Sequence, residues 1–220
     1  ITPEGAVVHQ VPGSLPGMNT TADRFTLTLL ADGSGRGEVR CSATGNRSLT
    51  IRQAFRNPLH RVPLLDRLHG RRSTGASTGA VGFSDLGDLK VPVSYEYSLI
   101  LPARARQRDG GLELELPEDP LRGAFERMGG RDPFAERLTG YCPGGPRRHD
   151  LVLPAAWSHT ASYSITLPPG WKAAELPPDA ELASDFGRLK ITRRFEEGKL
   201  RIDKAVSLAV TRVPAARCAE

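Results

Sequence analysis

Short stretches of alternating apolar and polar residues, separated by Leu-Pro steps and glycine turns, recur along most of this 220-residue chain. Residues 7–12 and 164–170 show the pattern near either end. Such alternation is typical of strands that bury one face, and 23 Gly with 18 Pro supply the turns between them. The sequence therefore predicts a mainly β fold, with antiparallel sheets in one or two sandwich-like layers.

Two hairpins and one long strand are predicted with their boundaries. The first hairpin spans residues 19–40 and reverses at Asp32-Gly33, where glycine tolerates the positive φ of a tight turn. A long strand follows at residues 91–101, with its apolar residues on one face. The second hairpin covers residues 187–210 and turns at residues 196–199.

Residues 49–69 break the alternation and predict a helical insertion. Two sets of residues there have helical spacing: Leu49, Arg52, Phe55 and Arg56, then Leu64, Leu65 and Leu68. Proline removes a backbone donor and disfavours the interior of a helix. Because Pro58 and Pro63 interrupt the segment, we expect two short helices separated by a kink.

The chain has one plausible internal boundary. Residues 118–148 are acidic at first and then rich in Gly, Arg and Pro, with little periodicity. The sequence therefore predicts a β subdomain at residues 1–118, an irregular linker at residues 119–148 and a second β subdomain at residues 149–220.

Charge and hydropathy argue against a nucleic acid partner and against a membrane span. The formal net charge of +5 comes mainly from arginine, and the tight basic pairs Arg71-Arg72 and Arg147-Arg148 lack the interleaved aromatic residues on which bases stack. We therefore expect no nucleic acid partner. No apolar run approaches the roughly 18 residues that a membrane helix needs, so no membrane span is predicted.

The three cysteines leave two readings open. Either one disulfide forms, for which Cys41 and Cys142 are the candidate pair, or all three thiols are reduced. Cys142 and His149 are also the only candidates for the thiol and base of a hydrolase, but the Pro and Gly residues around Cys142 favour a structural loop. No histidine pair has the spacing of a zinc helix, so neither a metal nor another cofactor is expected.

Several segments, taken in order, resemble the region C-terminal to the catalytic core of large bacterial transglutaminase-like proteins. These exported proteins carry an N-terminal β domain of unknown function. The segments are Ile1…Gly5…Val11-Pro12, Leu27-Thr28-Leu29-Leu30-Ala31-Asp32-Gly33-Ser34-Gly35-Arg36-Gly37, Gly45…Arg52, Phe83-Ser84-Asp85-Leu86…Val91-Pro92-Val93 and Tyr163…Leu167-Pro168-Pro169-Gly170-Trp171…Leu176-Pro177.

The resemblance implies that this chain is a module without catalytic activity of its own. The family's catalytic Cys, His and Asp lie in a papain-like core that would end just before Ile1, and no position here matches their motifs. We therefore expect a fragment or mature product of an exported protein, in the periplasm or at the cell surface. Its partner would be the upstream core of the same polypeptide, and the chain itself would not be an enzyme.

Two alternative functions are consistent with the sequence. An independent surface module would bind a polysaccharide or protein through exposed aromatic residues, for which Trp157, Trp171, Tyr141 and Tyr163 are the candidates. Such a module should show a concave, aromatic-lined groove, whereas an accessory module should show an apolar patch left bare by its core. The third alternative is a cysteine-dependent hydrolase.

Overall fold

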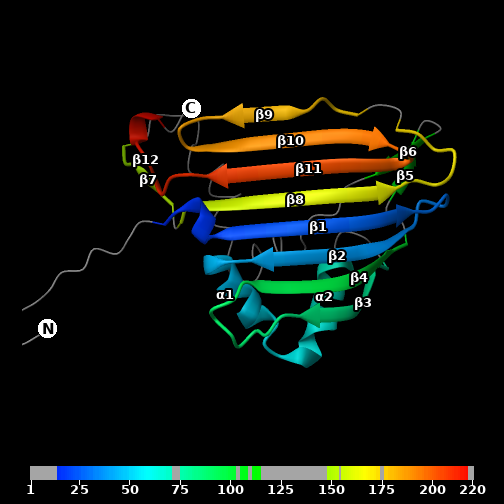
Figure 1. The fold of residues 1–220 in the computed structure, drawn as a ribbon, viewed down its shortest axis with the longest axis horizontal. Coiled ribbons are helices and arrows are strands. Elements are labelled where there is room, and N and C mark those ends of the chain that lie inside the picture. The colour runs from blue at the N-terminus through cyan, green and yellow to red at the C-terminus, as the bar shows by residue number, and fades with distance from the viewer. Residues whose placement is uncertain are drawn as a thin grey trace, which may run out of the picture.

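A computed structural model describes residues 14–70, 75–102, 105–108, 111–114, 148–153, 155–173 and 176–217. The main feature is one mixed sheet of eight strands, in the order β3-β4-β2-β1-β8-β11-β10-β9 (Figure 1). Its strands are β1 (Thr20–Leu29), β2 (Gly35–Ala43), β3 (Ser77–Phe83), β4 (Val93–Leu101), β8 (Trp157–Thr166), β9 (Ala180–Ala183), β10 (Gly187–Glu196) and β11 (Lys199–Leu208). The prediction of a mainly β chain is confirmed.

Both predicted hairpins form. In the first, β1 pairs antiparallel with β2, and the turn closes through the Leu30 N–H, which donates to the Ser34 carbonyl over 2.8 Å. Gly33 adopts φ +82° there, as a tight reversal requires. In the second, β10 pairs with β11 through a turn in which Glu197 and Gly198 both have positive φ. That backbone twist suits a two-residue hairpin loop.

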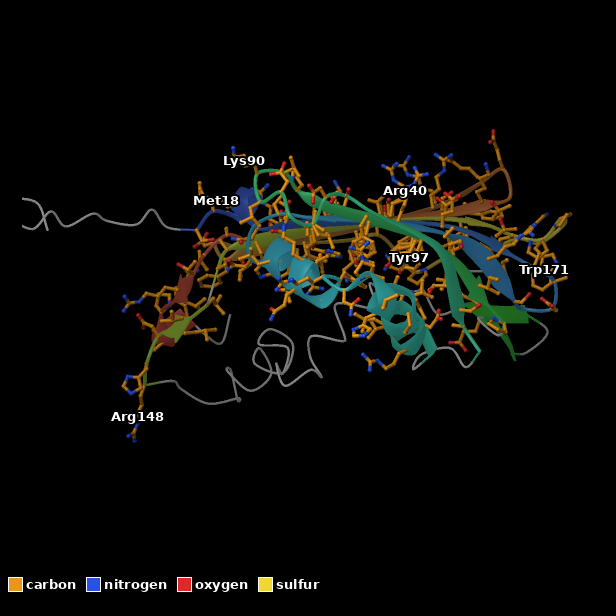
Figure 2. The ribbon with its side chains drawn as sticks, turned by 90° about the horizontal axis from the view of Figure 1, so that it is seen from below. Met18, Arg40, Lys90, Tyr97, Arg148 and Trp171 are labelled. Carbon is orange, nitrogen blue, oxygen red and sulfur yellow. The ribbon has the colours of Figure 1, made fainter. Side chains whose placement is uncertain are left out.

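The helical insertion consists of α1 (Gly45–Ala54), the 3-10 turn η2 (Pro58–His60) and α2 (Arg61–Gly70). The predicted kink therefore lies at Pro58 but not at Pro63, which sits in the first turn of α2, where a missing N–H costs nothing. Both helices lie against the same face of the sheet, which we call the inner face (Figure 2). The tyrosine ring of Tyr97 points toward them from β4.

The core fills the space between the inner face and the helices. Alternate residues of each central strand point inward, so β1 contributes Phe25 and Leu27, and β2 contributes Val39. Phe55, the residue that follows α1, and Leu65 of α2 complete this core, and both are fully buried. Within the described residues, the layer that covers the inner face of β2 and β4 is thus helical rather than a second sheet.

A parallel pair joins the two halves of the chain. Strand β1 pairs with β8 in parallel, with Thr20 opposite Ser158 and Thr28 opposite Thr166. The strands that we assigned to separate subdomains, at residues 1–118 and 149–220, are therefore neighbours in one sheet. The proposed linker at residues 119–148 falls largely outside the described part of the chain.

Smaller elements complete the fold. At one end of the sheet, the buried side chains of Leu151, Leu153 and Val213 form a second, small core. The remaining elements are η1 (Pro16–Met18), β5 (Ala105–Arg108), β6 (Gly111–Leu114), β7 (Leu151–Val152), β12 (Arg212–Val213) and η3 (Ala215–Arg217). Within the described ranges, neither helix is long and apolar enough to cross a membrane.

Candidate functional site

The face of the sheet opposite α1 and α2, which we call the outer face, carries polar side chains from the six neighbouring strands β4, β2, β1, β8, β11 and β10. Strand periodicity turns the even-numbered residues of β1, such as Arg24, to this face, and their exposure agrees with it. Arg40 of β2 points away from the helices in the same way (Figure 2). The strand register aligns six residues across the sheet as one charged row: Glu96, Arg40, Arg24, Ser162, Asp203 and Thr192.

Beside the charged row runs a row of mostly small side chains. The register aligns its members as Ser94, Ser42, Ala22, Thr160, Ala205 and Lys190. The two rows line a broad, open hollow of ≈ 860 Å³. Phe83 and Tyr95 also border it, but their rings pack on each other and on Phe55 in the core. The hollow therefore lacks the aromatic lining that we expected of a binding module.

Arg24 is the cation of this hollow with the fewest internal contacts. Arg40, directly opposite it on β2, contacts Glu96 at 3.2 Å and Glu38 at 3.5 Å. Arg24 itself forms no ion pair within the described residues and faces Ser162 on its other side. Like charges directly opposite each other on neighbouring strands are unfavourable. The pair therefore gives the centre of the hollow an excess of guanidinium donors.

A buried polar cluster lies on the inner face where β1 meets β8. His159 Nδ1 lies 2.8 Å from Thr21 Oγ1 and 3.9 Å from Asp23 Oδ2, and the Asp23 carboxylate is almost fully buried. Cys41 lies opposite Asp23 on β2, which places it two strands from His159, roughly 10 Å away. That separation is too long for imidazole to activate the thiol. The contacts of this cluster join β1 to β8.

The predicted aromatic residues do not form one surface. Tyr163 is buried, with 8% of its surface exposed, and its ring stacks on Phe25 with the centroids 4.8 Å apart. Trp157 is half-buried and is the first residue of β8. Trp171 lies beyond the last residue of that strand, at the opposite end of the sheet (Figure 2). Our expectation that Tyr163 is exposed is wrong, because Tyr163 is one of the alternate residues of β8 that point to the inner face. Tyr141 lies outside the described residues.

The cysteine predictions remain untested. Cys142 lies outside the described residues, so neither its contact with His149 nor a disulfide to Cys41 can be seen. Cys41 is buried in the sheet, and His149 is exposed in the bend before β7. In the described part of the chain, no group of three His, Cys, Asp or Glu side chains could hold a metal ion.

The sequence alone does not predict the charged row. Alternation indicates that Arg24 and Arg40 share the solvent-facing side of their hairpin. No local pattern indicates that β1 has β8 as its other neighbour, because the two strands are more than 120 residues apart. The row through Ser162 and Asp203 could therefore be found only from the strand register.

Comparison with known proteins gives one match. Residues 134–217 match a domain family described as "Domain of Unknown Function with solved-structure structure (DUF3858)". The match covers less than half of the chain and includes β7 to β12. No curated protein and no solved structure matches the chain.

Proposed function

We propose that this chain is a non-catalytic accessory module, C-terminal to a transglutaminase-like core of the papain-like Cys-His-Asp type, in an exported bacterial protein. Its outer face docks on that core. The observation that carries the proposal is the open hollow of ≈ 860 Å³ on this face, which spans strands from both halves of the chain. A face of this breadth suits a folded domain better than a small ligand, which needs an enclosing pocket.

The two rows of the outer face contain no large apolar side chain, so they do not form the apolar patch that we expected of an accessory module. Their chemistry instead suits a protein partner with complementary charges. The row of mostly small side chains lets a partner approach the strands closely. The charged row presents both signs of charge, with Arg24 and Asp203 on either side of Ser162. Complementary charges at an interface fix its register and exclude wrong partners. The resemblance described above supplies the identity of the partner.

A direct test begins with the coding region immediately upstream of Ile1. The proposal predicts that it encodes a Cys-His-Asp core and an export signal. The core, produced as a separate polypeptide, should bind the chain in a calorimetric titration, and cell fractionation should recover the parent protein outside the cytoplasm. An upstream region without such a core contradicts the proposal.

The variant Arg24→Glu tests the surface itself. Reversing the charge at the centre of the hollow should weaken binding of the core by about tenfold, or about 1.4 kcal/mol. The fold should be unaffected, because Glu at this position faces Arg40. Arg67→Glu is the matched control, since Arg67 is exposed on α2, on the other side of the sheet. Equal effects of the two substitutions would contradict docking through the outer face.

A further inference from the structure

A second hollow, of ≈ 490 Å³, lies between α1 and the loop at residues 84–92 that joins β3 to β4. Helix α1 lines it with Leu49, Arg52 and Gln53, and Arg56 follows one turn later. The three positions in α1 are spaced i, i+3 and i+4, so they share one side of the helix. The loop contributes Asp85 and the leucines described below.

Arg52 holds the loop on the helix. Its Nη1 donates to the carbonyls of Asp85 (3.2 Å) and Leu86 (2.8 Å), and its Nη2 donates to that of Val91 (2.7 Å). Arg52 is only 7% exposed, its Nε has no acceptor, and it forms no ion pair within the described residues. A buried charge without a counterion is costly, so an anion beside it is favoured.

Two further guanidinium groups border the same hollow. Arg61 donates its Nε to the Phe55 carbonyl and lies over the Phe83 ring at 4.6 Å, which leaves its terminal N–H groups for other acceptors. Arg56 is exposed and has no ion pair among the described residues. Asp85 is the acid in this lining, and its Oδ1 accepts from the Gly87 N–H at 2.7 Å. The hollow therefore contains three guanidinium groups and one carboxylate.

The rim of the hollow is apolar. Leu49 is 57% exposed and Leu89 is 73% exposed, one on the helix and the other on the loop. Guanidinium groups bind carboxylates through paired N–H donors. Exposed leucines beside such donors suit a ligand that combines a carboxylate with apolar neighbours. Inorganic oxyanions would contact the arginines but not the leucines.

We propose that this hollow, the arginine hollow, binds an acidic side chain of a polypeptide segment whose neighbouring residues are apolar. The carboxylate lies between Arg56 and Arg61, close to the buried Arg52, and the apolar neighbours cover Leu49 and Leu89. This site is on the helical side of the molecule. It stands independently of the docking surface on the outer face.

The test is a fluorescence anisotropy titration of the full chain with a fluorescein-labelled peptide of sequence Leu-Glu-Leu-Glu-Leu. The Leu-Gln-Leu-Gln-Leu peptide is the ligand control and should not bind. Arg56→Gln should weaken binding of the acidic peptide by about tenfold, the loss expected for one charge-assisted contact. Arg24→Gln removes the same charge from the outer face and should leave the affinity unchanged.

A second pair of measurements separates the peptide from a free anion. The double variant Leu49→Ala/Leu89→Ala should weaken peptide binding about fivefold, and millimolar phosphate should displace the peptide poorly. Unchanged affinity in this variant together with full displacement by phosphate would show a general oxyanion site and overturn the proposal. Absence of peptide binding, or equal losses in Arg56→Gln and Arg24→Gln, would overturn it as well. Each variant should fold, because the substituted side chains are exposed, and circular dichroism checks this.

Discussion

Gly37 lies where the backbones of β1 and β2 leave no room for a side chain. It pairs with Leu27, and a Cβ at position 37 would overlap the Thr26 carbonyl oxygen and lie 2.9 Å from the Leu27 Cα. Both of these neighbours are backbone atoms of a central strand, so they cannot move aside as the end of a side chain could. The pairing of the first hairpin therefore depends on glycine at this position.

We predict that Gly37→Ala lowers the free energy of unfolding by about 2–3 kcal/mol through overpacking. Gly35→Ala is the matched control, because its nearest contact would be the Thr28 carbonyl oxygen at an ordinary 3.6 Å. That variant should change the stability by less than about 1 kcal/mol. Urea unfolding of both proteins measures the difference, and equal stabilities would show that the hairpin can relax around the added methyl group.

Asn19 shows how one polar side chain connects distant segments. Its Nδ2 donates to Ser14 Oγ (2.8 Å) and to the Ala156 carbonyl (3.0 Å), while its Oδ1 accepts from the Asn46 N–H (3.0 Å). The side chain thus joins the start of β1 to the start of β8 and to the first turn of α1. Asn19 also begins a sequence that matches the glycosylation acceptor pattern. A glycan on Asn19 would replace one of the two Nδ2 hydrogens and so break at least one of the hydrogen bonds that Nδ2 donates.

Among the secondary-structure elements, β7 and β12 are connected by the side chain of Asp150, which directly precedes β7. Its Oδ1 accepts from the Ala215 N–H (2.9 Å) and its Oδ2 from Arg212 Nε (2.6 Å). These bonds favour the carboxylate and lower the pKa of Asp150 below the ordinary value of an aspartate, with the backbone bond from Ala215 the largest cause. The carboxylate thereby links the strand β7 to the C-terminal segment that follows β12.

The sign of the pKa shift predicts a weakening of this link in acid. The stabilisation is fully present above the ordinary pKa of aspartate and is lost as the pH falls through the lowered pKa of the folded state. Hydrogen exchange at the Leu153 N–H, which donates to the Thr211 carbonyl, should therefore rise in acid beyond the intrinsic dependence of exchange on pH. In Asp150→Asn that additional rise should be absent. An identical profile in the variant would contradict the role of Asp150.

The elements that could be predicted are those set by local chemistry. The hairpin at residues 19–40 follows from alternation and a glycine turn, and the helices near residues 49–69 follow from apolar spacing and Pro58. Strand pairing over long distances has no such local signal, so the parallel contact of β1 with β8 was not predicted. The same limit hid the charged row. Tyr163 was assigned to the surface because its ring partner, Phe25, lies on that distant strand.

In the molecule as a whole, the segment that matches the domain family contains only part of the eight-stranded sheet. Residues 134–217 contain β8 to β11, but the other neighbour of β8 is β1, from the unmatched part of the chain. A segment cut at residue 133 would expose the full edge of β8, with its unpaired backbone groups. The inner face of β8 would also lose the contact of Tyr163 with Phe25.

We therefore predict that residues 134–217 alone do not fold cooperatively. Their thermal unfolding, followed by circular dichroism, should lack the single transition of the full chain. Addition of residues 1–133 as a second polypeptide should restore that transition, because it supplies β1 as the missing neighbour. A cooperative transition in the isolated segment would show that the unit matched by the family is independent of the rest of the sheet.

Site-specific photocrosslinking detects whether the outer face docks on an upstream core. A benzoylphenylalanine at Ser162 places the crosslinker in the hollow, between Arg24 and Asp203. The same group at Leu59, which is 81% exposed on η2, reports on the helical side. Docking through the outer face predicts crosslinks to the core from position 162 and none from position 59. Crosslinks from position 59 alone would contradict it.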